Sequence, residues 1–524
     1  MTGRFFMKIY WNAWPVRRVQ ICYAGSTRSQ RRARVSIRPD KCEGFTRRVV
    51  RPRSLAPCMR HIALAMMAAT LFVGCAVGPN YKRPEVAAPT QWKEATATNA
   101  TLVMPTNWWT IFGDAELDRL ETQAISANQD LKRAVARVTE ARAIARLSEA
   151  DIYPRVTASG GHTLNHLSKN QEHAPLRNHE YEEHTRQVDL EYEIDAWGRV
   201  RRSIEAGKAD HAAIQTDLQV LLLTLTSDVA RNYKSLRSLD REKQVTEATI
   251  ALRLDAVRLQ ETRNKAGLIN EVDVTRARTE LANVEAELHS INRSRAQVEH
   301  ALAVLCGQAP AEFTLAAASS DVSAPEIPAG LPSSLMERRP DVVEAEQKLH
   351  AECARIGVAK AAFFPTIKLT GASGATTADL GLLLNPHSRL WQIGPSIHFP
   401  IFEGGRNSAN LKAAEARYEQ AVASYQGTVL NAFREVEDSL SDLSTLRLQS
   451  EAVNRALLSA RDTAALAAER YERGLSSYLD VVDAQRAVLQ AERTAVQLNG
   501  QHAASTVLLA KAIGGGWKHQ ENAQ

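Results

Sequence analysis

The 524-residue sequence has little cysteine and no long apolar run. Six cysteines are too few for a disulfide-stabilised scaffold. No stretch approaches the roughly 18 consecutive apolar residues that predict a membrane-spanning helix. The patterns of a P-loop, a nucleophile elbow, a CxxC pair and an HExxH zinc site are also missing. We therefore expect neither a helical membrane protein nor an enzyme, and we expect no resident metal or cofactor.

Charge is distributed very unevenly along the chain. Residues 1–74 hold 15 Lys and Arg against 2 Asp and Glu, a balance of +13. The totals of 65 and 59 then leave 50 basic and 57 acidic residues in 75–524, a balance of −7. The overall charge of +6 is therefore a property of the N-terminal segment, and it does not indicate a nucleic-acid partner.

Residues 59–74 have the pattern of a lipoprotein signal peptide. Arg60 precedes a 12-residue apolar run, 62–73, which is too short to span a bilayer and fits a secretory segment. Gly74 then precedes Cys75, as in a site where the signal peptide is removed before a lipid-modified cysteine. We expect diacylglyceryl and N-acyl groups on Cys75, although Phe72 stands where leucine is usual. The alternative is a buried core segment with an incidental cysteine.

Residues 1–58 carry 14 Lys and Arg and show no apolar periodicity. Because Met59 is well placed to begin the signal peptide, we expect translation to start there. A disordered basic arm is the alternative.

The remainder of the chain contains two copies of one plan. Three segments recur in the same order at offsets of 207 to 211 residues, which indicates a tandem duplication of about 200 residues per copy. The matched pairs are 150–160 with 361–371, 194–210 with 401–417, and 264–281 with 471–489.

Each copy contains one very long predicted helix. Residues 199–266 and 406–473 lack proline and carry apolar residues at alternating spacings of three and four. At 1.5 Å per residue, each helix would be roughly 100 Å long. Glycine ends both helices, and second helices over 271–305 and 479–512 run back, so each copy forms a helical hairpin. The predicted hairpin-tip turns are Gly267, Leu268, Gly474 and Leu475.

Strand-like segments precede each long helix. Residues 187–195 alternate apolar and polar side chains, which is the pattern of a transmembrane barrel strand. Residues 391–399, 154–164 and 365–375 give three more strands, and four strands cannot close a barrel. Three chains would supply 12 strands and two chains 8. The polar face of the first strand, Asp189, Glu191 and Glu193, would line a cation-favouring lumen; the alternative is a soluble hairpin with one wet face.

Histidine and cysteine offer weaker candidates. Five histidines lie within 23 residues, and we expect a solvated loop there, with metal binding as the alternative. They are His162, His166, His173, His179 and His184. Cys306 and Cys353 are the other thiols after Cys75, and either a disulfide or two buried free thiols would fit.

Several motifs resemble the TolC/OprM type of outer-membrane efflux lipoproteins, also described as NodT-type outer-membrane factors of multidrug efflux systems. The resemblance covers essentially all of 75–524. Its matching segments include NWWTIFGDAELDRL from 107, EYEIDAWGRVRR from 191, LMERRPDVVEAEQ from 335 and YERGLSSYLDVVDAQR from 471. It implies a homotrimer, anchored in outer-membrane lipid, in which a 12-stranded β-barrel continues into a periplasmic α-barrel. It also implies a periplasmic adaptor (membrane fusion protein) and an inner-membrane pump as partners.

The resemblance further implies a periplasmic gate at the hairpin tips. Leu479, Asp483 and Arg486 fall on one helix face, and a trimer would turn each carboxylate into a ring. The predicted gate residues are Leu479, Asp480, Asp483 and Arg486, with Val272, Asp273 and Arg276 in the first copy. The alternative is an ordinary surface pair between Asp483 and Arg486.

The predicted fold is an α+β membrane protein with two long helical hairpins and four transmembrane strands per chain. The expected segments are 1–58 (basic extension), 59–74 (signal peptide), 75–130 (lipid-anchored equatorial segment), 131–310 (first repeat), 311–340 (equatorial linker), 341–513 (second repeat) and 514–524 (tail).

The favoured function is a passive trimeric conduit that exports drugs or toxic small molecules, such as aromatic acids. A type I protein-secretion duct and a structural periplasm-spanning lipoprotein are the alternatives.

Overall fold

The computed structural model describes residues 76–93, 104–168, 180–318, 325, 327 and 337–517. All of them belong to one compact unit, residues 68–524. The basic extension, the signal peptide, Cys75, His173 and His179 lie outside the described residues.

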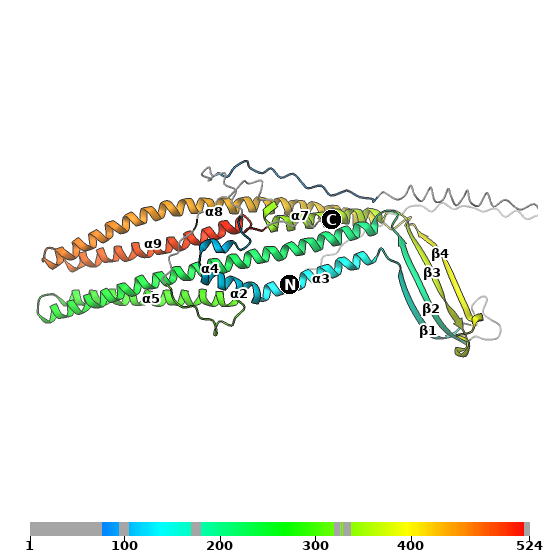
Figure 1. The fold of residues 1–524 in the computed structure, drawn as a ribbon, viewed down its shortest axis with the longest axis horizontal. Coiled ribbons are helices and arrows are strands. Elements are labelled where there is room, and N and C mark those ends of the chain that lie inside the picture. Colours follow the sequence, from blue (N-terminus) through cyan, green and yellow to red (C-terminus); the bar gives the residue numbers. More distant parts are fainter. Residues whose placement is uncertain are drawn as a thin grey trace, which may run out of the picture. The chain divides into compact units, whose positions relative to one another are not determined.

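The elements repeat in the same order, which confirms the predicted duplication (Figure 1). Matching helices have equal lengths of 22, 67 and 35 residues. After η1 (Trp108–Phe112) and α2 (Ala115–Ala127), the first copy comprises α3 (Gln129–Ala150), β1 (Arg155–His166), β2 (Glu180–Ile194), α4 (Arg199–Lys265) and α5 (Glu271–Leu305). The second comprises α7 (Pro340–Ala361), β3 (Thr366–Thr377), η2 (Leu380–Leu382), η3 (Pro386–Ser388), β4 (Arg389–His398), α8 (Arg406–Glu472) and α9 (Tyr478–Ala512).

The two long helices end within one residue of their predicted limits. Neither α4 nor α8 contains proline, so no intrahelical hydrogen bond is lost over 67 residues. Each helix pairs with its return helix, α4 with α5 and α8 with α9, and the two hairpins meet where α4 packs against α9. The hairpins extend away from the sheet, which lies at the opposite end of these helices (Figure 1).

The largest apolar cores lie midway along the helices. One groups Trp108, Tyr233 and Leu302 from η1, α4 and α5 with their neighbours. The other packs Tyr425 and Val436 of α8 against α7 and the C-terminal end of α9. The tips have a smaller apolar cluster, so the midsection is where hydrophobic burial stabilises the hairpins most.

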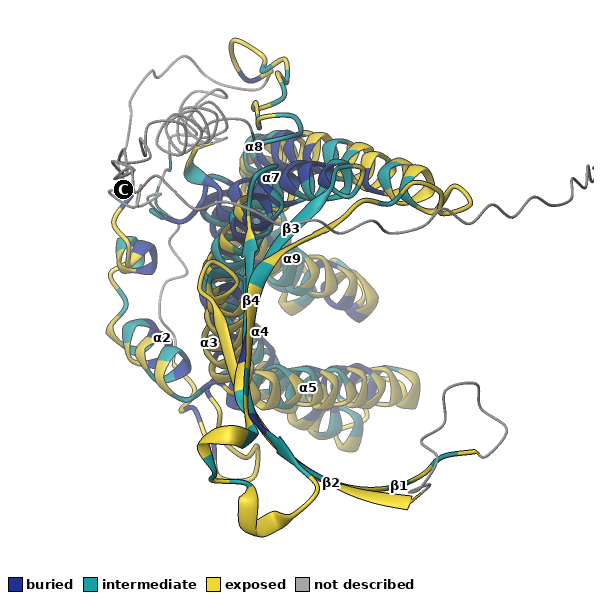
Figure 2. Ribbon diagram, turned by 90° about the vertical axis from the view of Figure 1, so that its right-hand side faces the viewer, coloured by how far each residue is buried: buried dark blue, intermediate teal, exposed yellow. Residues whose placement is uncertain are grey.

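The four strands form one antiparallel sheet in the order β1-β2-β3-β4. The regular register places Val188, Leu190, Tyr192 and Ile194 of β2 on one face with Ile367, Leu369, Trp391, Ile393 and Ile397. Trp391 is 77% exposed and Ile397 68% exposed on this apolar face. The opposite face carries Asp189, Glu191, Glu193 and Lys368. Figure 2 shows how much of β1 and β2 is exposed.

The predicted limits of the strands are wrong by one or two residues, except at the start of β2, where the error is larger. The strand predicted at 187–195 begins at Glu180, so it includes Glu182 and His184. His162 and His166 likewise belong to β1. The expected solvated loop is therefore incorrect for these three histidines. Alternation of apolar and polar residues could not reveal this part of the sheet, because residues 180–187 are polar on both faces apart from Tyr181.

None of the described helices is long and apolar enough to cross a membrane.

Arg339 ties the second repeat together at the start of α7. This 7% exposed side chain donates to both carboxylate oxygens of Asp341, at 3.0 and 2.6 Å. It also donates to Glu435 of α8 at 2.7 Å and to the carbonyl oxygen of Ala512, the last residue of α9, at 3.1 Å. A single guanidinium thus joins the start of α7, the middle of α8 and the end of α9, which gives the arginine of the RRPD sequence a structural role.

Replacing Arg339 by Ala should destabilise this junction by on the order of 3 kcal/mol, because acceptors on three helices lose a charged donor. Thermal unfolding of the purified protein would measure the loss. Arg338→Ala removes the neighbouring, less buried guanidinium and should leave the transition nearly unchanged. Equal shifts for both variants would contradict the assigned role of Arg339.

Candidate functional site at the hairpin tips

The two hairpin turns have the same geometry. In the first, the Leu268 amide donates to the Arg263 carbonyl at 2.9 Å; in the second, the Leu475 amide donates to the Arg470 carbonyl at 2.8 Å. Gly267 and Gly474 have φ of 70° and 72°, the left-handed conformation that ends helices and favours glycine. The predicted turn residues therefore lie at equivalent positions of two equivalent turns, and both leucines are exposed.

Asp480 has a structural role within the described chain. Its carboxylate accepts from the Ser477 amide at 3.0 Å, and the two residues form a capping box at the start of α9. The equivalent cap of α5 is Asn270, which accepts from the Val272 amide. Asp480 thus fixes where the return helix begins.

Asp483 and Arg486 form the predicted pair, at 3.2 Å, and Arg486 has a second partner. Its Nε donates to Oε2 of Glu280 on α5 at 2.9 Å, and its Nη2 bonds the other carboxylate oxygen. The Glu280 side chain is only 6% exposed, whereas Asp483 and Arg486 are more than half exposed. Arg486 therefore connects the return helices of the two hairpins, and the pair with Asp483 is the peripheral part of that contact.

The first-copy residues make a weaker local contact. Arg276 and Asp273 lie 3.7 Å apart on α5, and Val272 is 53% exposed. Leu479, at the corresponding side of α9, is also exposed. These side chains leave an accessible surface at the tip of each hairpin.

Further polar bonds join the hairpins close to the tips. Tyr471 of α8 donates to Gln260 of α4 at 3.1 Å, and Arg253 of α4 donates to Gln485 of α9 at 2.7 Å. Gln260 and Arg253 are almost fully buried. Beside them, Val257, Ala277, Tyr478, Val481 and Val482 form a small apolar cluster.

A second charged cluster lies two helical turns further along α9. Arg493 donates to Glu242 of α4 at 2.7 Å and also bonds Glu287 of α5. Gln497 donates to the same oxygen of Glu242 at 3.1 Å. The contact between the hairpins near the tips therefore depends heavily on buried charged and polar groups.

The electrostatics follow from these contacts. Hydrogen bonding to Arg486 lowers the pKa of Glu280 below its usual range. Burial lowers the pKa of Arg253. Because Glu280 is stabilised as a carboxylate in the folded state, its contribution is fully present above its unfolded pKa and is lost as pH falls through the lower folded value.

The acidic strand residues are partly neutralised. Glu193 accepts two hydrogen bonds from Arg199, at 2.7 and 2.8 Å, and Glu191 accepts one from Lys368 at 2.7 Å. Asp189 accepts from the Gln187 amide nitrogen. The three predicted residues do share a face, but two of them are paired with basic side chains.

Cys306 and Cys353 are both free and buried. Burial raises the pKa of the Cys306 thiol to about 11, which makes its thiolate scarce at neutral pH. Of the two possibilities left by the sequence, the structure has two buried free thiols.

Glu280, Arg253, Gln260 and Arg493 were not predicted as site residues. One signal was available for Glu280, because it occupies the buried stripe of α5 that also contains Ala277 and Val284. A charged residue in such a stripe indicates a buried partner. The identity of that partner, 206 residues away, requires the three-dimensional structure.

Comparisons with known proteins agree with the repeated architecture. A sequence model of the family described as outer membrane efflux protein matches residues 120–308 and 331–515. The cation efflux system protein CusC of Escherichia coli K12 is 32% identical, over 88% of this chain and 100% of its own length. The solvent efflux pump outer membrane protein SrpC of Pseudomonas putida is 32% identical over the same shares. The solved structure of the outer-membrane channel OprN aligns with a TM-score of 0.79 and 30% identity, covering 84% of this chain and 99% of its own.

Glu280→Gln should weaken the contact between the hairpin tips by about 2 kcal/mol at neutral pH, because the charge-assisted bonds to Arg486 are lost. Native-state hydrogen exchange of α5 and α9 would measure this. Lowering the pH through the depressed pKa of Glu280, below the usual range of a glutamate, should reduce the difference between wild type and variant, since acid then protonates Glu280 in the wild type as well.

Glu261→Gln is the matched control. It removes a carboxylate that pairs with Arg278 at 2.6 Å on a more exposed part of the first hairpin. Solvent screens an exposed pair, so its effect on exchange should be smaller than that of Glu280. A Glu261 effect equal to that of Glu280 would show that the cross-hairpin bond has no special weight.

Proposed function

This chain belongs to the outer membrane efflux protein family, and we propose that it is the outer-membrane duct of a tripartite efflux system. It acts as a passive conduit without catalytic activity. The observation that carries the proposal is the junction of two kinds of structure in one chain: a sheet with an exposed apolar face continues directly into helical hairpins of 67 and 35 residues.

The sheet supports a trimer. Strands β1 and β4 are its two edges, and their outward-facing backbone groups need partners where lipid surrounds them. Three copies arranged edge to edge supply 12 strands, whose apolar face contacts lipid and whose polar face lines the lumen. Two copies would supply 8 strands. Side chains fill the interior of a barrel of that size.

The hairpins support a periplasmic tunnel. A 67-residue helix is about 100 Å long, which is enough to carry the route well beyond the membrane. The tips then lie far from the outer membrane, where a periplasmic adaptor and an inner-membrane pump would engage them. The free energy for export comes from that pump.

Residues next to Cys75 support a lipid anchor at the membrane surface. The Val77 amide donates to the Trp197 carbonyl at 3.0 Å, where β2 turns into α4. Ala76 lies so close to Gly198 that a Cβ built on this glycine would be 2.7 Å from its Cα. The chain after Cys75 is thus held beside the sheet, the position from which acyl groups reach the bilayer.

The tip supports a gate. The exposed residues Val272, Leu479 and Asp483 are available for contacts between neighbouring chains, while the bond of Arg486 to the buried carboxylate of Glu280 holds the two hairpins of one chain in register. We assign the closed state to contacts between chains at these exposed positions.

Another component of the assembly selects the exported compounds. The names of CusC and SrpC refer to cation efflux and solvent efflux, although both are 32% identical to this chain. We propose export of toxic small molecules, including drugs and aromatic acids, with the pump selecting among them. A polypeptide-secretion duct is not favoured, because these relatives belong to efflux systems.

The double variant Asp483→Ala, Arg486→Ala should raise single-channel conductance several-fold in planar bilayers, because it removes both the ring of carboxylates and the bond to Glu280. Glu280→Gln alone should give a smaller increase. Arg461→Ala serves as the control, since its pair with Glu492 joins α8 and α9 within one hairpin. Unchanged conductance in the double variant would disprove the gate, and a protein that never conducts would disprove the duct.

Cys75→Ser should abolish incorporation of labelled palmitate and should release part of the protein from the outer membrane. Metabolic labelling followed by membrane fractionation would test this. Cys306→Ser is the control, because this buried thiol lies in the helical core. Persistent labelling of the Cys75 variant would contradict the anchor.

A further inference from the structure

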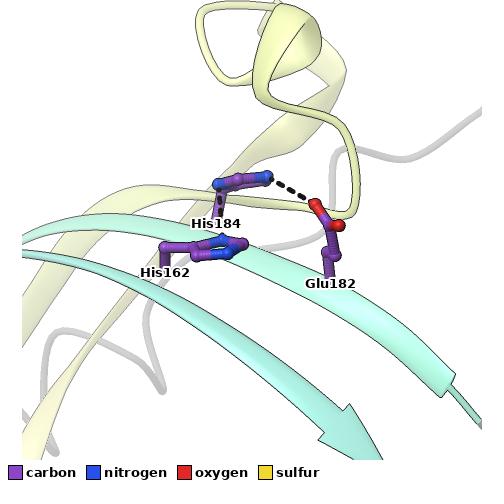
Figure 3. A group of neighbouring side chains, drawn as sticks. All are labelled: His162, Glu182 and His184. Carbon is purple, nitrogen blue, oxygen red and sulfur yellow. Dashed lines mark hydrogen bonds and ion pairs between the residues drawn. The ribbon is translucent and has the colours of Figure 1, made fainter.

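Two histidines face each other across the membrane-distal part of β1 and β2. His162 and His184 are direct partners in the antiparallel register, so both side chains project from the same face of the sheet. Glu182 precedes His184 by two residues and therefore shares that face. Figure 3 shows the two imidazoles stacked, with the Glu182 carboxylate beside His184.

The donor atoms are within coordination range of a single ion. Nδ1 of His162 lies 3.2 Å from Nδ1 of His184, and Nε2 of His184 lies 3.5 Å from a carboxylate oxygen of Glu182. One donor atom from each residue can be chosen so that all three lie within 4.8 Å of one another. Two nitrogens bound to a tetrahedral zinc ion at 2.0–2.1 Å would be about 3.3 Å apart. To bind one ion, the stacked imidazoles would turn until one nitrogen lone pair of each ring points to it.

The surroundings favour a cation. On β1 and β2, Glu180 and Glu182 bring two negative charges to this face, against one positive charge from Arg186; Arg389 of β4 shares the face but lies two strands away from β2. His166 already pairs with Glu180 at 2.9 Å, next to the site. The exposed position leaves room for water molecules to complete the coordination shell, as in metal sites with three protein ligands.

Contact with lipid does not explain why these residues are polar. On this face of β2 the apolar side chains begin at Val188, and the positions from Glu180 to Arg186 are polar or charged. At about 3.3 Å per residue, His184 lies roughly 13 Å beyond Val188 along the strand. On β2 the cluster thus lies past the last apolar residue of this face, and Leu164 of β1, opposite Glu182, is an isolated apolar residue there.

We propose that His162, Glu182 and His184 form a binding site for a divalent transition-metal ion, of the kind that imidazole and carboxylate ligands select, such as Zn²⁺ or Cu²⁺. The bound ion joins β1 to β2 at the distal end of the sheet. This site is separate from the duct and its gate, so it does not depend on the proposed export function.

Titration calorimetry of the purified full-length protein with Zn²⁺ should show one saturable site per chain. His162→Ala and His184→Ala should each lower the affinity at least tenfold, because each removes a ligand. Glu182→Gln should cause a smaller loss. His387→Ala is the matched control, since this exposed histidine lies in η3 and has Asn385 as its hydrogen-bond partner.

Two readouts make the test independent of folding defects. Cu²⁺ bound to the wild type should show nitrogen hyperfine coupling from two imidazoles, and the single variants should show one. Zn²⁺ should also slow amide exchange in residues 160–166 of the wild type. Absence of saturable binding, or binding unchanged in the His162→Ala, His184→Ala double variant, would overturn the proposal.

Discussion

The open edges of the four-stranded sheet are the constraint on which the rest of the molecule depends. Among the described residues, no strand pairs with the outer side of β1 or β4, and each unsatisfied backbone group costs several kcal/mol in hydrocarbon. The sheet is equally unsuited to water, because its apolar face leaves Trp391 77% exposed. Edge-to-edge closure by further copies resolves both problems. Because each pair of strands continues into a hairpin, closure of the sheet also arranges the hairpins around the same axis.

Stabilisation changes in kind along the hairpins. Midway, bulky apolar residues such as Trp108 and Tyr425 fill the space between helices. Near the tips, Arg486, Arg493 and Arg253 bond across the seam instead. Each contact has one buried charged partner, Glu280, Glu242 or Arg253, and breaking it leaves that charge unpaired, so these contacts fix register strongly. A tip built this way can open locally while the midsection stays folded.

The sequence predicted those parts of the fold that local rules determine. Two proline-free runs ending at Gly267 and Gly474 located the long helices to within one residue, and alternation around Val188 to Ile194 located the membrane half of β2. The sequence did not predict the distal half of β2 as a strand. Its residues are polar on both faces apart from Tyr181, so no alternation of apolar and polar side chains marks a strand there. The acceptors of Arg486 and Arg339, Glu280 and Glu435, are remote in sequence, and local patterns cannot pair them. The motifs therefore located the hairpin tip in the sequence, but the partners of its charged side chains could be identified only in the folded structure.

The two copies differ at the hairpin tips. This difference assigns distinct roles to the contact between the two hairpins of one chain and to the contact between hairpins of neighbouring chains. At the repeat offset of 207, Glu280 corresponds to Ala487 and Arg486 to Thr279, so the Arg486–Glu280 bond cannot form a second time between a second hairpin and the first hairpin of the next chain. In the proposed gate, the contact between neighbouring chains uses the residues that remain exposed, namely Leu479 and Asp483 on one side and Val272 and Arg276 on the other. Exposed pairs are weak and sensitive to salt, whereas the bond within the chain ends on the buried carboxylate of Glu280 and is screened less. Opening should therefore separate neighbouring chains first, with each chain's two hairpin tips moving together as a unit.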